Sequence, residues 1–196
     1  MNLLLRLAAA IDGLNRRVGH SVSWLVLVMV LVSAVNALTR YGFQLSSNAW
    51  LELQWYLFGA VFLLAAGFTL QQDAHIRIDV LSSRYSPRAK AWLDILGTLL
   101  FLLPLSVFMV ALSWPMFVHA WMGNEVSSSA GGLARWPVRL MVPAGFLLLS
   151  LQGLSQMIKA VALLLGRPLE PPIATDRNSS STDSAVNSSA RGAGHL

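Results

Sequence analysis

Four histidines could do chemistry in this sequence, because imidazole binds haem iron and other metal ions. A membrane-bound b-type haem needs two imidazoles that face each other from two helices at a common depth. His20 and His119 fall near opposite faces of the predicted membrane domain, and His75 and His195 fall in segments outside its helices. No pair of histidines can therefore share an iron, and we predict no haem or other cofactor in this chain.

Glu52 is the one carboxylate at the start of a long apolar stretch. A carboxylate buried in a membrane often marks a proton or cation pathway, since a bare charge there costs several kcal/mol. The structural alternative is an interfacial carboxylate that is solvated or paired with Arg40 across a short connection. We favour the pair. An independent small transporter or channel that uses Glu52 stays open as the alternative function.

Two further motifs carry weaker chemical signals. The run His75-Ile76-Arg77-Ile78-Asp79, with Asp73 before it, lacks a third firm metal ligand at helical spacing. The alternation of polar and apolar side chains in this run favours a segment whose isoleucines enter the membrane interface while its charged side chains face water. The run Ser127–Gly132 lacks the Lys-Ser/Thr ending of a phosphate-binding loop, so we interpret it as a turn in an external docking loop.

The composition shows what must position these residues. Of 196 residues, 55% are hydrophobic and 12% charged, with a mean hydropathy of +0.59. Soluble domains carry about 25% charged residues, so a water-soluble enzyme is excluded and we expect no enzymatic activity. The absence of cysteine excludes disulfides and thiol chemistry. The net charge of +5 fits basic loops beside anionic lipid better than nucleic-acid binding.

Four uncharged stretches are long enough to cross a bilayer, which needs about 20 residues. They predict an all-α integral membrane protein with spans at about 21–39, 51–71, 91–115 and 138–165, inside a transmembrane domain of residues 20–167. Residues 1–19 predict a short amphipathic interfacial helix, because Leu4, Leu7, Ile11 and Leu14 follow helical spacing. A signal peptide is the alternative reading. Residues 168–196 have the composition of a disordered tail.

The lysines and arginines set the expected orientation, because cytoplasmic flanks accumulate them. Eleven of the 14 lie in the N-terminal flank, the second connection and the C-terminal side. The other three are Arg40, Arg135 and Arg139, in the first and third connections. Both termini are therefore predicted to be cytoplasmic.

A family resemblance rests on motifs that occur in a fixed order. They are Arg40-Tyr41-Gly42-Phe43, Trp50-Leu51-Glu52-Leu53, His75–Leu81, Asn124–Ser127, Gly131–Pro137 and Pro143–Phe146. With four spans, this order resembles the small DctQ-type membrane subunit of tripartite ATP-independent periplasmic (TRAP) transporters, over about residues 20–165. Many members carry two acidic residues where this chain has Leu51-Glu52, which puts any role of a carboxylate pair in doubt.

The resemblance implies a bacterial inner-membrane complex. A periplasmic binding protein captures an organic acid, and a large permease subunit carries the substrate and sodium sites. The small subunit braces the stationary scaffold. Two rival functions stay open, a membrane enzyme or electron-transfer subunit and an assembly factor.

We name nine candidates for contact with partner proteins. Gly67 allows close helix approach, Trp121 and Trp136 are aromatic anchors, and Arg135 and Arg139 could steer an acidic patch. The remaining candidates are Arg40, Glu52, His75 and Asp79.

Overall fold

The computed structural model describes residues 2–43, 48–72, 87–129 and 132–166. Its elements are α1 (Asn2–Gly42), α2 (Asn48–Gln71), α4 (Pro87–Gly97), the π-helix η1 (Thr98–Leu102), α5 (Leu103–Met122) and α6 (Trp136–Leu164). Four helical segments are long and apolar enough to cross a membrane: Leu3–Gly42, Asn48–Gln71, Arg88–Met122 and Trp136–Leu164. The all-α architecture with four candidate spans is confirmed. The interfacial, transmembrane and tail boundaries stay predictions, and residues 168–196 lie outside the described part.

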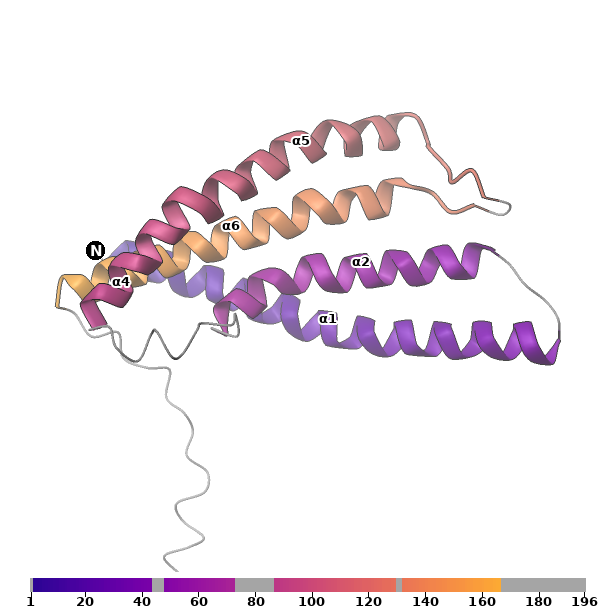
Figure 1. The fold of residues 1–196 in the computed structure, drawn as a ribbon, viewed down its shortest axis with the longest axis horizontal. Helices are drawn as coiled ribbons and strands as arrows, with labels where there is room; N and C mark the ends of the chain where they lie inside the picture. Colours follow the sequence, from indigo (N-terminus) through magenta and orange to yellow (C-terminus); the bar gives the residue numbers. More distant parts are fainter. Residues whose placement is uncertain (1, 44–47, 73–86, 130–131, 167–196) are drawn as a thin grey trace, which may run out of the picture.

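Helix α6 is the centre of the bundle and packs against α1, α2, α4 and α5. Figure 1 shows α1 and α2 as one antiparallel pair and α5 and α6 as another, with the two pairs side by side. Small residues of α6 allow close packing: a Cβ on Gly145 would lie 2.7 Å from the Leu63 carbonyl oxygen, and one on Gly153 would lie 2.6 Å from Leu102 Cδ2. Helices in lipid associate through such close contacts.

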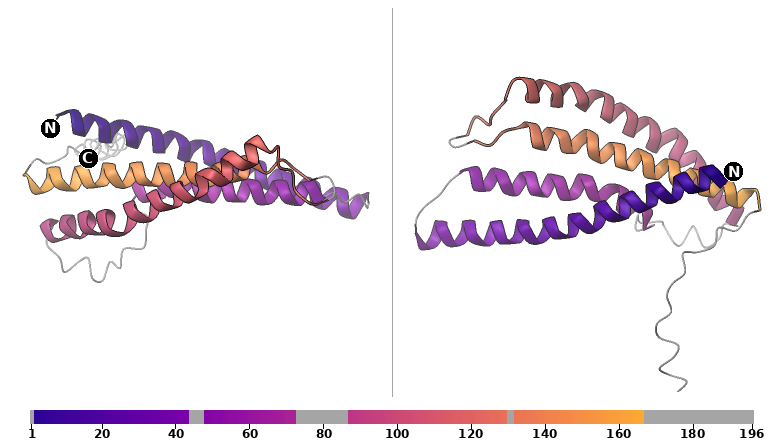
Figure 2. Two further views of the ribbon diagram at one scale, coloured as in Figure 1. Left: turned by 90° about the horizontal axis from the view of Figure 1, so that it is seen from above. Right: turned by 180° about the vertical axis from the view of Figure 1, so that it is seen from behind.

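Helix α1 is much longer than a bilayer requires. Its 41 residues extend about 61 Å, against a hydrocarbon core of about 30 Å. No break separates residues 2–19 from the rest of the helix, so the structure does not show the short separate helix expected there. Ala8 and Asn15 are buried in this segment, and Ser155 of α6 donates to the Ala8 carbonyl at 3.2 Å. The N-terminal part of α1 therefore packs on α6, and Figure 2 shows the two side by side.

The third span joins α4 to α5 through the π-helical turn η1, and its direction changes there (Figure 2). Pro104 lies two residues after the end of η1, and a proline ring clashes with the carbonyl four residues earlier, here that of Leu100 within η1. A widened turn relieves this clash, which explains the position of the π-helix.

Candidate functional site

Glu52 lies in the second turn of α2 and holds the connection between α5 and α6. Its Oε1 accepts a hydrogen bond from the Ser127 hydroxyl, and its Oε2 accepts one from the Leu133 backbone N–H at 3.1 Å. Arg40 is exposed near the end of α1, and no ion pair within the described segments joins it to Glu52. Instead of pairing with Arg40, Glu52 thus bonds to Ser127 and Leu133, which lie 75 and 81 positions further along the chain.

The connection that Glu52 holds is a short hairpin, here called the α5–α6 hairpin, formed by residues 123–129 and 132–135. Val126 and Ala134 form an antiparallel bridge, and backbone N–H groups of Ser127 and Arg135 donate to the carbonyls of Leu133 and Glu125 at 2.9 and 2.8 Å. A Cβ on Gly132 would lie 2.4 Å from the Ser127 carbonyl oxygen, so this turn requires glycine. The described residues of this segment therefore form a hairpin with its own backbone hydrogen bonds.

Glu125 forms ion pairs with two arginines, Arg135 within the hairpin and Arg139 of α6. Arg135 Nη1 lies 3.1 Å from Glu125 Oε1, and Arg139 contacts both carboxylate oxygens, at 2.6 and 2.8 Å. Arg139 also donates to the Met116 carbonyl of α5 at 3.3 Å. Both guanidinium groups keep unused donors, because each has five N–H groups. The arginines expected to steer a partner thus also fix the fold of this end.

The aromatic candidates meet at the same end of the bundle. Trp121 and Trp136 pack edge to face, with ring centroids 4.7 Å apart. Beside the hairpin lies a groove of about 540 Å³, whose lining includes Glu52, Trp55, Tyr56, Arg135 and Arg139. Five of the nine predicted contact residues, Glu52, Trp121, Arg135, Trp136 and Arg139, therefore belong to one cluster.

A second polar cluster joins α1 to α6 at the opposite end of the bundle. Asp12 of α1 forms an ion pair with Lys159 of α6. Gln152 and Ser155 donate to Asp12 Oδ1 at 3.0 and 2.8 Å. These interactions link residues about 140 positions apart, and the sequence analysis did not predict them.

Helix α2 enters the same cluster through its last two turns. Asn15 Nδ2 donates to Gln152 Oε1 at 2.8 Å, and Gln71 Nε2 donates to the Asp12 backbone carbonyl at 3.2 Å. Gly67 lies against Asn15, because a Cβ there would be 2.4 Å from Asn15 Oδ1. Gly67 therefore makes a close contact inside this chain.

A sequence signal for this cluster exists. Gln152, Ser155, Gln156 and Lys159 repeat at positions i, i+3, i+4 and i+7 of an otherwise apolar helix. That spacing places four polar side chains on one helical face. A polar face on a membrane-spanning helix indicates contact with another polar helix, and Asp12 and Asn15 supply it in α1.

The chain matches the family described as "Tripartite ATP-independent periplasmic transporters, DctQ component" over residues 10–163. The matched range contains the residues of both clusters. The chain belongs to the DctQ family. Comparisons with curated proteins and with solved structures gave no match.

DctQ membership makes this chain the small membrane component of a TRAP transporter, and the family is a transporter component rather than an enzyme family. The four apolar helices agree with a multi-pass membrane protein. Within the described residues, no group of three His, Asp or Glu side chains is placed to hold a metal ion. His75 and Asp79, named as contact candidates, lie outside the described part of this DctQ component.

Proposed function

We propose that this chain braces a large permease subunit in a TRAP transporter of the bacterial inner membrane, with both termini in the cytoplasm. In this proposal, the permease carries the substrate and sodium sites, and a periplasmic protein delivers an organic acid. This chain supplies rigid membrane scaffold and holds no cofactor.

The distribution of charge carries the proposal. Asp12 and Lys159 neutralise each other in one cluster, and Glu125 pairs with Arg135 and Arg139 in the other. Between the clusters, residues 18–39 of α1, 53–71 of α2 and 140–158 of α6 contain no Asp, Glu, Lys or Arg. A carrier of an organic anion places binding chemistry near the membrane midplane. A middle without these charges, with an ion pair in the cluster at each end, suits a scaffold instead.

Reconstitution tests the proposal against an independent transporter. In the presence of the binding protein, we expect sodium-driven uptake of the organic acid into liposomes that contain both membrane subunits. Liposomes with this chain alone should show none. Uptake by this chain alone that is abolished by Glu52→Gln would refute the scaffold function and favour the independent transporter.

The α5–α6 hairpin is the surface that we propose for the binding protein. An Arg135→Glu/Arg139→Glu variant reverses both charges but also breaks the pairs with Glu125. Glu125→Gln is the matched control, because it breaks the same pairs and leaves both arginines in place. We expect the arginine variant alone to lose uptake at low binding-protein concentration, by about tenfold or less, and to recover when more is supplied. Equal behaviour of the two variants across the titration would exclude a docking role for the arginines.

A further inference from the structure

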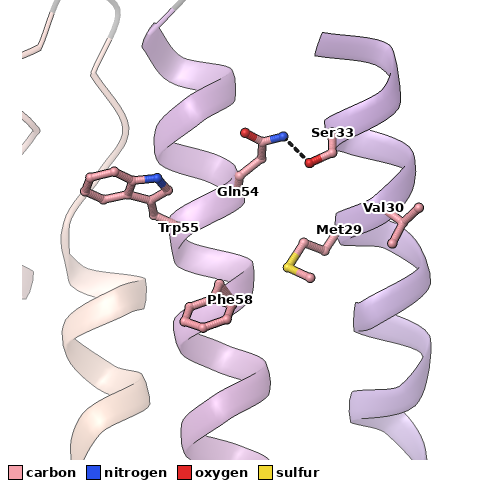
Figure 3. A pocket seen from close by; sticks show the side chains of 6 residues that line it. All are labelled: Met29, Val30, Ser33, Gln54, Trp55 and Phe58. Atoms are coloured by element: carbon pink, nitrogen blue, oxygen red, sulfur yellow. Dashed lines mark hydrogen bonds between the residues drawn. The ribbon is translucent and has the colours of Figure 1, made fainter. Parts of the chain in front are cut away.

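A groove of about 560 Å³ lies on the outer surface between α1 and α2, on the opposite side of Trp55 from the hairpin groove. Met29, Val30 and Ser33 of α1 line it, with Gln54, Trp55 and Phe58 of α2. Figure 3 shows the Gln54 amide turned toward Ser33, with Met29 about one turn away on the same helix. Its lining is therefore polar at one end and apolar at the other.

At the polar end of this groove, the Gln54 amide has hydrogen-bonding groups that the described part of its own chain leaves unpaired. Gln54 Nε2 donates to the Ser33 hydroxyl. Within the described segments, the amide's second hydrogen and its Oε1 have no protein partner. Gln54 lies four residues beyond Trp50, or about 6 Å further along the helix axis. Hydrocarbon offers no hydrogen bonds, so leaving these groups against lipid tails is costly.

The outer face of α5 provides a contrast. Its exposed side chains between residues 99 and 112 are all apolar, and Ser106, the one polar side chain there, is buried. Acyl chains can cover such a face without contacting any exposed hydrogen-bonding side chain, since the Ser106 hydroxyl, which has no partner within the described residues, is buried beneath it. In the α1–α2 groove, by contrast, an amide and a hydroxyl lie among the lining side chains. Trp55 is 78% and Phe58 62% exposed there.

We infer that one membrane-spanning helix of the large permease occupies the α1–α2 groove and presents a hydroxyl, amide or free carbonyl group to Gln54. Side-chain hydrogen bonds between helices hold membrane bundles together in this way. The inference rests on the proposed partnership with a large permease, and it adds which face makes the contact. The α5 face is left to lipid.

Photo-crosslinking tests the choice of face. The chain has no cysteine, so a single cysteine carries a benzophenone maleimide at one defined position. Phe58→Cys places the probe in the groove, and Phe108→Cys places it on α5 at a matched exposure, 62% against 59% in the native residues. The probes are irradiated in membranes that contain this chain and the permease, and adducts are identified by mass.

We expect an adduct with the permease from Phe58→Cys and at least fivefold less from Phe108→Cys. Equal yields, a higher yield from α5, or an adduct of two copies of this chain would overturn the inference. So would adducts with lipid alone from Phe58→Cys while the unlabelled subunits co-purify. Failure of the unmodified subunits to co-purify would instead refute the proposed partnership itself.

A second pair of variants tests the hydrogen bond. Gln54→Leu removes the amide and should reduce recovery of the permease about threefold to tenfold, from the strength of single hydrogen bonds between membrane helices. Gln54→Asn keeps an amide and should retain more of the recovery than Gln54→Leu. Unchanged recovery with Gln54→Leu would overturn the role of the amide, because a lipid-facing leucine needs no partner.

Discussion

Gly67→Ala is the substitution whose effect the structure predicts most directly. The added methyl would lie 2.4 Å from Asn15 Oδ1 and 3.2 Å from the Leu148 carbonyl oxygen. Both neighbours are fixed, since Asn15 is fully buried and bonded to Gln152. The helices must move apart or the Asn15–Gln152 bond must break.

The expected magnitude combines two opposing terms. Overpacking a filled interior lowers the free energy of unfolding by about 1–3 kcal/mol. Replacing a helical glycine by alanine raises it by up to about 1 kcal/mol. A net loss of about 1–2 kcal/mol should lower the melting temperature by roughly 3–6 °C for a chain of this length. Gly59→Ala is the control on the same helix, because nothing lies within 4 Å of its Cβ position.

Intrinsic tryptophan fluorescence during heating of the purified protein gives the measurement, since the chain has seven tryptophans. Gly59→Ala should melt at the native temperature or slightly above it. Equal melting temperatures for the two variants would refute the close packing of α1 on α2. Restoration of stability by Asn15→Ala in the Gly67→Ala background would identify the asparagine as the obstacle.

Three further outcomes follow from the polar clusters and the expected orientation. Lys159→Met should lower stability by about 1–3 kcal/mol, less than for a fully buried pair because Lys159 is 33% exposed; adding Asp12→Asn should recover part of this loss in the same melting assay. Glu52→Gln should accelerate proteolysis of the α5–α6 hairpin, because an NH2 group replaces one of the two oxygens that accept bonds from the hairpin and the remaining amide oxygen carries no charge; an unchanged cleavage rate would mean that Glu52 does not hold it. In intact spheroplasts, an impermeant thiol reagent should label Ser128→Cys but not Arg88→Cys, and the reverse pattern would invert the proposed orientation.

The apolar stretches predicted the helices well, because a bilayer requires long runs of apolar residues wherever they occur in the chain. Tryptophan and arginine positions also predicted which residues gather at the hairpin. Both predictions depend on local composition, which the sequence displays directly.

The partner of Glu52 and the continuity of α1 could not be predicted in the same way. Arg40 is near Glu52 in sequence, whereas Ser127 and Leu133 reach it only after the whole bundle has assembled. Leu4, Leu7, Ile11 and Leu14 indicated a short separate helix, yet α1 continues without a break beyond residue 19, and α6 supplies polar partners for Asp12 and Asn15. Such contacts between distant segments depend on tertiary packing, which patterns within one segment do not reveal.

The central position of α6 has a consequence for biosynthesis. This helix contacts α1, α2, α4 and α5, yet it is the last of the described helices to leave the ribosome. Until then, Asp12 and Asn15 lack the side-chain partners that α6 gives them. Helices α1 and α2 can pack on each other before that, but the contacts that join this pair to α4 and α5 run through α6 and form only when the fourth span arrives. A ribosome that stalls before Trp136 would leave three helices in which the Asp12 carboxylate lacks its ion pair with Lys159.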